Sequence, residues 1–278
     1  MIRRLLFCLL TLSACCLPLC AQAPADSLSD ESRFAPLDSL LTQFYGALER
    51  EETAVKNAEF DSLIGSCSDS LMRRHVALSV FDHYRFSRVM GEEAVALHIY
   101  DEWIASGRVR PRSEFELFEA ERFALENRRT QIGMTAPQLS LRTPCGARKK
   151  IPARGRPAVL FFYSPHCAKC RLETYALPAV LADVAFPLNF YAVDVDADRR
   201  DFRRFRKALG TSRGKVRMIH LWDPKSESLM LLDYGVFSTP KLFVVWEDGE
   251  ILGRRLEMNN LREMIHYINM LSGQEKEE

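Results

Sequence analysis

The chain has 278 residues, of which 47% are hydrophobic and 27% charged, and its formal net charge is +1. This length exceeds that of one typical domain, so two domains are expected, with enough apolar residues for packed cores. The near-neutral charge argues against a protein that binds nucleic acid or another polyanion. Beyond the N-terminal segment, no apolar run is long enough to span a bilayer.

Residues 1–23 have the layout of a secretory signal peptide. Two arginines precede the apolar run Leu5–Leu12, and small residues lead to Ala21-Gln22-Ala23. Two processing routes are open. Cleavage after Ala23 would release a soluble protein, and the shortness of the apolar run favours this route. Alternatively, the residues before Cys15 resemble a bacterial lipobox, and Cys15 would then carry a lipid anchor. Both routes predict export to the periplasm or cell envelope.

The next part of the chain predicts a flexible spacer and then an all-α domain. Residues 24–33 are small, polar and acidic, which is typical of a spacer. Residues 34–131 carry apolar side chains at helical spacing and no catalytic motif. We interpret the histidines in this region, His75, His83 and His98, as structural, because no two of them form an H-x-x-x-H pair. The helices are expected over Leu37–Leu48, Thr53–Ile64, Asp69–Phe86, Glu92–Ser106 and a segment that begins after Pro111.

Residues 132–273 alternate between strand and helix signals, and a charged tail covers residues 274–278. The order of these signals predicts an α/β domain with a central mixed sheet flanked by helices on both faces. We interpret the arginines of the segment Arg199–Leu209 as a solvated helix face, although such a cluster could attract an acidic partner. The strands are expected over Gly133–Leu141, Lys149–Ile151, Ala158–Tyr163, Leu188–Val195, Val216–Leu221 and a hairpin around Glu247–Glu250; the helices over Arg171–Leu181, Arg199–Leu209 and Leu261–Leu271.

Two cysteines at C-x-x-C spacing, Cys167 and Cys170, follow the strand Ala158–Tyr163 after a Ser-Pro break. A helix that starts there places Cys167 at its N-terminus, where unpaired backbone N–H groups and the positive end of the helix dipole favour a thiolate. Cys170 lies one turn further on, close enough to form a disulfide. Either neighbouring cation, His166 or Lys169, would stabilise the thiolate if it lies near the sulfur.

This arrangement resembles the thioredoxin superfamily over about residues 132–271. The segment Phe237–Val245 resembles the second landmark of that family. The resemblance implies that Pro240 is a cis-proline packed against the reactive cysteines, and that Thr239 offers backbone hydrogen bonds to a substrate peptide. The segment Gly133–Leu141 resembles the opening strand of the TlpA-like and peroxiredoxin-like branches. A helical domain followed by such a domain is similar to a family of bacterial envelope proteins.

Two residues depart from the familiar thioredoxin pattern. His166 stands where tryptophan usually precedes the first cysteine, and Phe161 stands where thioredoxin has a buried carboxylate that assists proton transfer. Glu173 is a candidate replacement, because C-x-x-C-x-x-E resembles some TlpA-like sites. The alternative interpretation of Glu173 is a solvated helix residue.

These features predict an exported thiol–disulfide oxidoreductase that acts on protein disulfides or dithiols and is recharged by a membrane or periplasmic redox partner. The alternatives are a binding protein on a thioredoxin-like scaffold, a structural disulfide and a thiol peroxidase, although Leu160 stands where a peroxidase motif needs proline. No cofactor and no metal are expected. A zinc site would require Cys145 and His166 as further ligands, and haem attachment requires a histidine where Arg171 stands.

Overall fold

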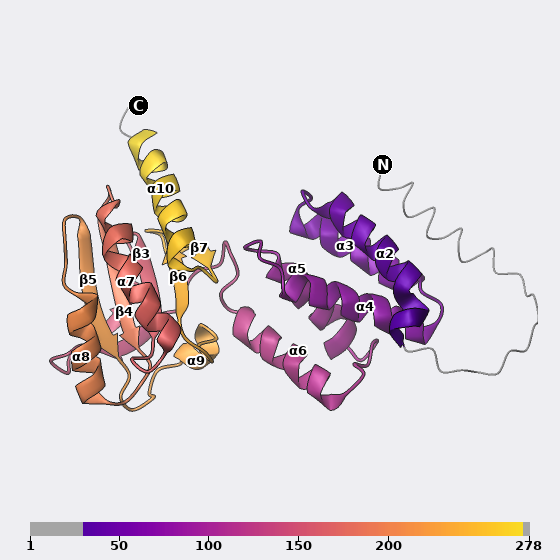
Figure 1. Ribbon diagram of the computed structural model, residues 1–278, viewed down its shortest axis with the longest axis horizontal. Coiled ribbons are helices and arrows are strands. Elements are labelled where there is room, and N and C mark those ends of the chain that lie inside the picture. Colours follow the sequence, from indigo (N-terminus) through magenta and orange to yellow (C-terminus); the bar gives the residue numbers. More distant parts are fainter. Residues whose placement is uncertain (1–29, 275–278) are drawn as a thin grey trace, which may run out of the picture. The chain divides into compact units, whose positions relative to one another are not determined.

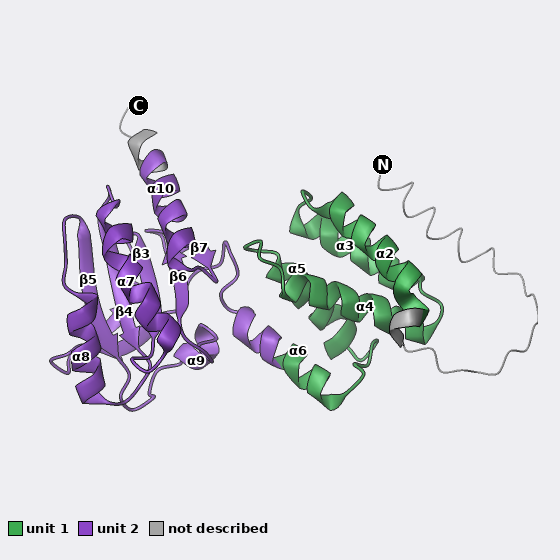
Figure 2. Ribbon diagram, in the orientation of Figure 1, with its two compact units in different colours: residues 1–121 green, residues 122–278 purple. Residues whose placement is uncertain are grey.

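The computed structural model describes residues 30–274, which form two compact units that divide between residues 121 and 122 (Figure 2). The predicted signal peptide, the site of lipidation at Cys15 and most of the predicted spacer lie outside the described residues. Within residues 30–274, every helix is too short or too polar to cross a membrane.

The first unit is helical (Figure 1). Asp69 lies immediately before the third described helix and accepts hydrogen bonds from the backbone N–H groups of Leu71 and Met72, at 3.3 and 3.2 Å, so it caps that helix. The elements are α2 (Asp30–Leu48), α3 (Thr53–Ser66), α4 (Ser70–Arg85), α5 (Glu93–Ile99), the π-helix η1 (Tyr100–Ala105) and the first part of α6 (Glu114–Asn127).

Two helix predictions need correction. Helix α2 begins at Asp30, inside the predicted spacer, and Phe34 ties its first turns to α4 by stacking on His75 with ring centroids 4.1 Å apart. The helix predicted over residues 92–106 is α-helical only as far as Ile99 and continues as a π-helix. The wider turn carries Trp103, whose indole N–H donates to Asp61 at 2.7 Å.

The three histidines have structural contacts, in line with their interpretation. His75 lies 2.6 Å from an Asp38 carboxylate oxygen, and His98 lies 2.9 Å from Asp61. His83 stacks on Tyr45.

The second unit is built on a seven-stranded mixed sheet of order β2-β1-β5-β4-β3-β6-β7. The central strands β3, β4 and β5 are parallel neighbours, while β6 and β7 pair antiparallel at one side and β1 and β2 at the other. The strands are β1 (Leu139–Arg142), β2 (Arg148–Ile151), β3 (Ala158–Tyr163), β4 (Leu188–Asp194), β5 (Val216–Trp222), β6 (Lys241–Val245) and β7 (Ile251–Arg254).

Both faces of the sheet are buried, which explains why β3 is a continuous apolar run and β4 is mostly apolar. Helices α7 (Ala168–Ala182), α8 (Arg199–Leu209) and α10 (Met258–Gln274) pack on one face (Figure 1). The opposite face packs against the short helix α9 (Met230–Asp233) and the segment that leads into β1. The predicted mixed sheet with flanking helices is therefore confirmed.

The end of α6 belongs to the second unit, so the predicted boundary at residues 131/132 lies too far along the chain. Asn127 holds Arg254, which is 3% exposed: its side-chain oxygen accepts from the Arg254 guanidinium at 2.6 Å and its backbone oxygen at 3.3 Å. Glu126 pairs with Lys241 at 3.2 Å. These contacts join residues more than 100 positions apart, which a local pattern in the sequence does not reveal.

Candidate active site

Cys167 is the N-cap residue of α7. Strand β3 ends at Tyr163, a Ser-Pro turn follows, and the Cys167 sulfur accepts a hydrogen bond from the backbone N–H of Cys170 at 3.0 Å. An N-cap side chain satisfies a helix N–H that would otherwise be unpaired, and a negative charge at this position is favoured by the helix dipole. The local sequence therefore places the first sulfur where its thiolate is stabilised.

The two thiols have opposite environments. Cys167 is half-buried and Cys170 is fully buried, and both are free thiols in the structure. Partial burial on its own raises the pKa of Cys167, but hydrogen bonds from the Cys170 thiol, the backbone N–H of Cys170 and the Thr239 side chain outweigh it, so the pKa is lowered. Burial, reinforced by the hydrogen bond to Cys167, raises the pKa of Cys170 to about 12. One sulfur is suited to attack and the other to remain protonated.

Thr239, which precedes Pro240, lies against the Cys167 sulfur although it is distant in sequence. The Thr239–Pro240 peptide bond is cis, and the Cys167 thiol donates to the Thr239 carbonyl at 3.3 Å. The preceding loop passes close to α6 at Gly235, where φ is +57° and an added Cβ would collide with the backbone of Glu126. The loop position therefore depends on a glycine at residue 235.

His166 and Lys169 face other groups than the sulfur. The His166 ring lies 3.2 Å from Asp201 and is 70% exposed, and Lys169 pairs with Glu257 at 2.6 Å. The stabilisation of the Cys167 thiolate comes mainly from hydrogen bonds and not from these two cations.

Glu173 is a helix cap in this structure. Its carboxylate accepts from the backbone N–H of Met258, the first residue of α10, at 2.9 Å. This contact explains why α10 begins at Met258, ahead of the predicted Leu261. The observed partner of Glu173 is thus a helix N-terminus and not the Cys170 thiol.

A buried carboxyl group that sequence reasoning missed lies on the sheet face that carries Cys170. Asp194, at the end of β4, is 0% exposed, and its register partner on β3 is Tyr163. One Asp194 oxygen accepts from the backbone N–H of Asp196 at 2.8 Å, and the other has no hydrogen-bond partner among residues 30–274. Burial, aided by the charges of nearby aspartates, raises the pKa of Asp194 to about 7.

The sequence of β4 indicates that Asp194 faces the core, because side chains along a strand point alternately to the two faces of the sheet. Leu188, Phe190 and Ala192 all face the core under α7, so Asp194 has the same parity and must face it too. Phe161 on β3 is apolar, but the same face of the sheet still carries a buried carboxyl group, that of Asp194 on the neighbouring strand β4.

The turn before Cys167 is fixed by a polar contact with the same strand end. The Ser164 hydroxyl donates to Asp196 at 2.7 Å and accepts from the backbone N–H of His166 at 3.1 Å. The Asp194-Val195-Asp196 segment therefore supports the loop that presents Cys167. Among residues 30–274, no three His, Cys, Asp or Glu side chains are grouped as a metal site.

The sheet order, the N-terminal position of Cys167 on α7 and the adjacent Thr-Pro turn define the class of thioredoxin-like proteins. A family model of a thioredoxin-like domain matches residues 146–267. The C-terminal unit is therefore a thioredoxin-like domain, and this part of the chain belongs to the thioredoxin superfamily.

The chain is similar to several solved structures. A thioredoxin-like protein from Bacteroides caccae is 14% identical, with a TM-score of 0.65 over 88% of each chain. The thioredoxin domain of a thiol-disulfide oxidoreductase from Bacteroides vulgatus is 17% identical over 49% of this chain and 96% of its own, with a TM-score of 0.44. A thiol-disulfide oxidoreductase from Bacteroides fragilis is 19% identical over 47% and 98%, with a TM-score of 0.40. No curated protein sequence matches the chain.

Proposed function

We propose that the protein is an exported thiol–disulfide oxidoreductase that uses Cys167 as nucleophile and Cys170 as resolving thiol. The observation that carries this proposal is the contrast between the two sulfurs. Cys167 is partly exposed, accepts a helix N–H and touches Thr239, whereas Cys170 is buried and its pKa is raised to about 12. Such asymmetry supports attack by one thiol and delayed release by the other.

The reaction transfers two electrons to the substrate. The Cys167 thiolate attacks one sulfur of a substrate disulfide, the substrate S–S bond breaks, and a mixed disulfide forms. The leaving substrate thiolate takes up a proton. Cys170 then loses its proton and attacks the Cys167 sulfur, which releases the second substrate thiol and leaves a Cys167–Cys170 disulfide. A membrane or periplasmic dithiol partner must reduce that disulfide before the next cycle.

Thr239 would hold the substrate segment beside the mixed disulfide. Its carbonyl lies 3.3 Å from the Cys167 sulfur, so a chain linked to that sulfur passes directly over it. Backbone hydrogen bonds between Thr239 and an extended substrate segment would orient the disulfide for in-line attack.

An insulin-reduction assay tests the proposal. The native protein should catalyse precipitation of the reduced B chain, the Cys167→Ser variant should be inactive, and the Cys170→Ser variant should accumulate a mixed disulfide that mass spectrometry detects. Cys145→Ser is the matched control, because this exposed thiol lies on the β1–β2 turn. Activity in Cys167→Ser equal to that of the native protein would refute the assignment of the nucleophile.

The thiol peroxidase alternative has less support. Leu160 fills the place of the motif proline and is fully buried in β3, and the Ser164 hydroxyl is bonded to Asp196. A peroxide-binding hydroxyl beside Cys167 would need Ser164 to leave that contact.

Export is proposed from residues 1–23. Fractionation of cells that produce the full chain should place it in the periplasm or envelope. Mass spectrometry of its mature N-terminus separates cleavage after Ala23 from lipidation at Cys15. Recovery of the unprocessed chain from the cytoplasm would refute export.

A further inference from the structure

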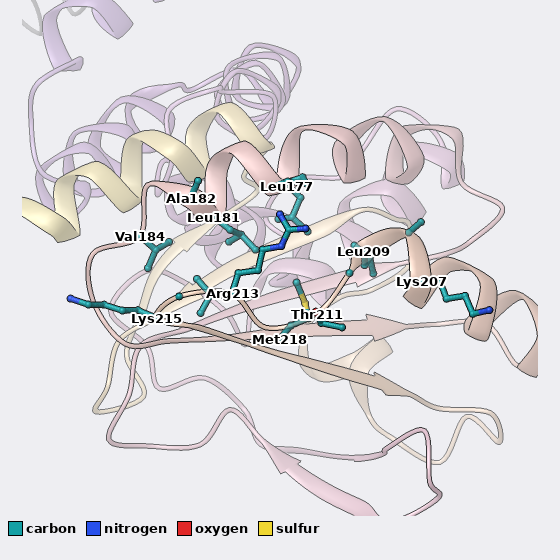
Figure 3. Close-up of a pocket in the computed structure, with 15 residues that line it drawn as sticks. Leu177, Leu181, Ala182, Val184, Lys207, Leu209, Thr211, Arg213, Lys215 and Met218 are labelled. Carbon is teal, nitrogen blue, oxygen red and sulfur yellow. The ribbon is translucent and has the colours of Figure 1, made fainter.

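Two adjoining hollows lie between α7 and α8, and the first begins at the reactive turn. It has a volume of about 560 Å³ and is lined by His166, Arg171, Tyr175 and Arg204, among others. The second has a volume of about 430 Å³ and lies further along α7 (Figure 3). Pro178 and Ala208 line both hollows, so the two hollows adjoin along α7 and α8. We call this pair of hollows the α7–α8 groove.

The α7–α8 groove is positively charged although the chain as a whole is nearly neutral. Helix α8 carries five arginines and one lysine against one aspartate within 11 residues. Among the described residues that line the groove, Asp201 is the one carboxylate, and it is paired with His166. Arg171 and Arg204 have no ion-pair partner in the described part of the chain, so their charge is available to a ligand.

The far end of the groove is lined by both apolar and basic side chains. Leu177, Leu181 and Met218 form part of the wall, and Arg213 extends across the hollow toward α7 (Figure 3). Tyr175, on the groove-facing side of α7, is 83% exposed. An exposed aromatic ring beside free guanidinium groups is typical of a protein-binding surface.

We infer that the α7–α8 groove binds an acidic, extended segment of the substrate protein next to the disulfide that Cys167 attacks. This inference rests on the proposed oxidoreductase function and specifies its substrate class. Helix α7 has 15 residues, and at 1.5 Å per residue it is roughly 22 Å long. An extended chain rises about 3.3 Å per residue, so the groove accommodates about six substrate residues. Acidic residues near the substrate cysteine would meet Arg171 and Arg204, and apolar residues further away would meet Leu177 and Leu181.

The test compares two disulfide-linked peptides that differ only in the six residues beside one cysteine. In one peptide these residues are two leucines and otherwise acidic residues, and in the other they are two leucines and otherwise serines. Reduction is followed at 0.15 M salt, where interactions between exposed charges beyond about 8 Å are screened. The native protein should show a kcat/KM ratio, acidic over neutral, of about three- to tenfold, as expected for two exposed ion pairs. The double variant Arg171→Gln/Arg204→Gln should lower this ratio to about one.

The matched control is Arg199→Gln/Arg203→Gln, which removes the same charge from the other side of α8, next to Cys145. The control should keep the ratio of the native protein. A native ratio near one, or an equal loss of the ratio in both double variants, would overturn the groove assignment while leaving the oxidoreductase function intact. Failure to reduce either peptide would instead refute the oxidoreductase function, and the groove assignment with it.

Discussion

Replacing Cys170 with alanine should make Cys167 a weaker acid. The Cys170 thiol is a hydrogen-bond donor to the Cys167 sulfur and one of the contacts that lower its pKa. A hydrogen bond to a charged group contributes about 1.5–3 kcal/mol. Because Cys167 is only half-buried, the lower end applies. The proton-dissociation constant of Cys167 should therefore fall about tenfold, since 1.36 kcal/mol corresponds to a factor of ten.

The assay is the rate of alkylation by iodoacetamide as a function of pH, in a background in which Cys67 and Cys145 are replaced by serine. The matched control is Cys170→Ser, whose hydroxyl can still donate to the Cys167 sulfur. The midpoint pH of its alkylation rate should therefore stay well below that of Cys170→Ala. Identical midpoints for the two Cys170 variants would show that the backbone N–H groups alone hold the thiolate. The explanation based on paired thiols would then be wrong.

Three further substitutions test the packing around the site. Asp194→Asn should remove a pH dependence of stability: burial raises the pKa from its ordinary 3.8 to about 7, so the native carboxyl costs stability as pH rises through that window. Urea unfolding at pH 5 and pH 8 should show a smaller decrease for the variant, and an unchanged decrease would contradict the burial argument. Gly235→Ala should lower the free energy of unfolding by about 2 kcal/mol or more, because of the positive φ and the collision with Glu126; a melting temperature equal to that of the native protein would count against it. Glu173→Ala should cost about 1 kcal/mol through loss of the cap on Met258, with little change in the rate of mixed-disulfide resolution. A large fall in that rate would identify Glu173 as the base.

Local features of the sequence were sufficient for the fold of the second unit. The apolar runs that became β3 and β4 are bounded by clear turn signals, and the C-x-x-C pair follows β3 directly. Cys167 could be placed at a helix N-terminus because the strand, the Ser-Pro break and the helix are consecutive.

Features that depend on tertiary contacts were less accessible. The unit boundary was misplaced because Asn127 packs on Arg254, which a sequence pattern cannot show. The side chains of His166 and Lys169 lie against Asp201 and Glu257 and not against the Cys167 sulfur. These two acids are distant in the chain, so the orientations could not be read from the sequence. Asp194 was within reach of the sequence, since its parity on β4 marks it as an inward-facing acid.

A redox titration of the native protein in dithiothreitol buffers tests the central claim most directly, with alkylation and mass spectrometry to count free thiols. We predict that Cys167 and Cys170 become protected from alkylation together, as they form a disulfide in a single two-electron transition, while Cys67 and Cys145 remain reduced. A pair that stays reduced or stays oxidised across the whole range, or protection of Cys167 together with another cysteine, would contradict the account.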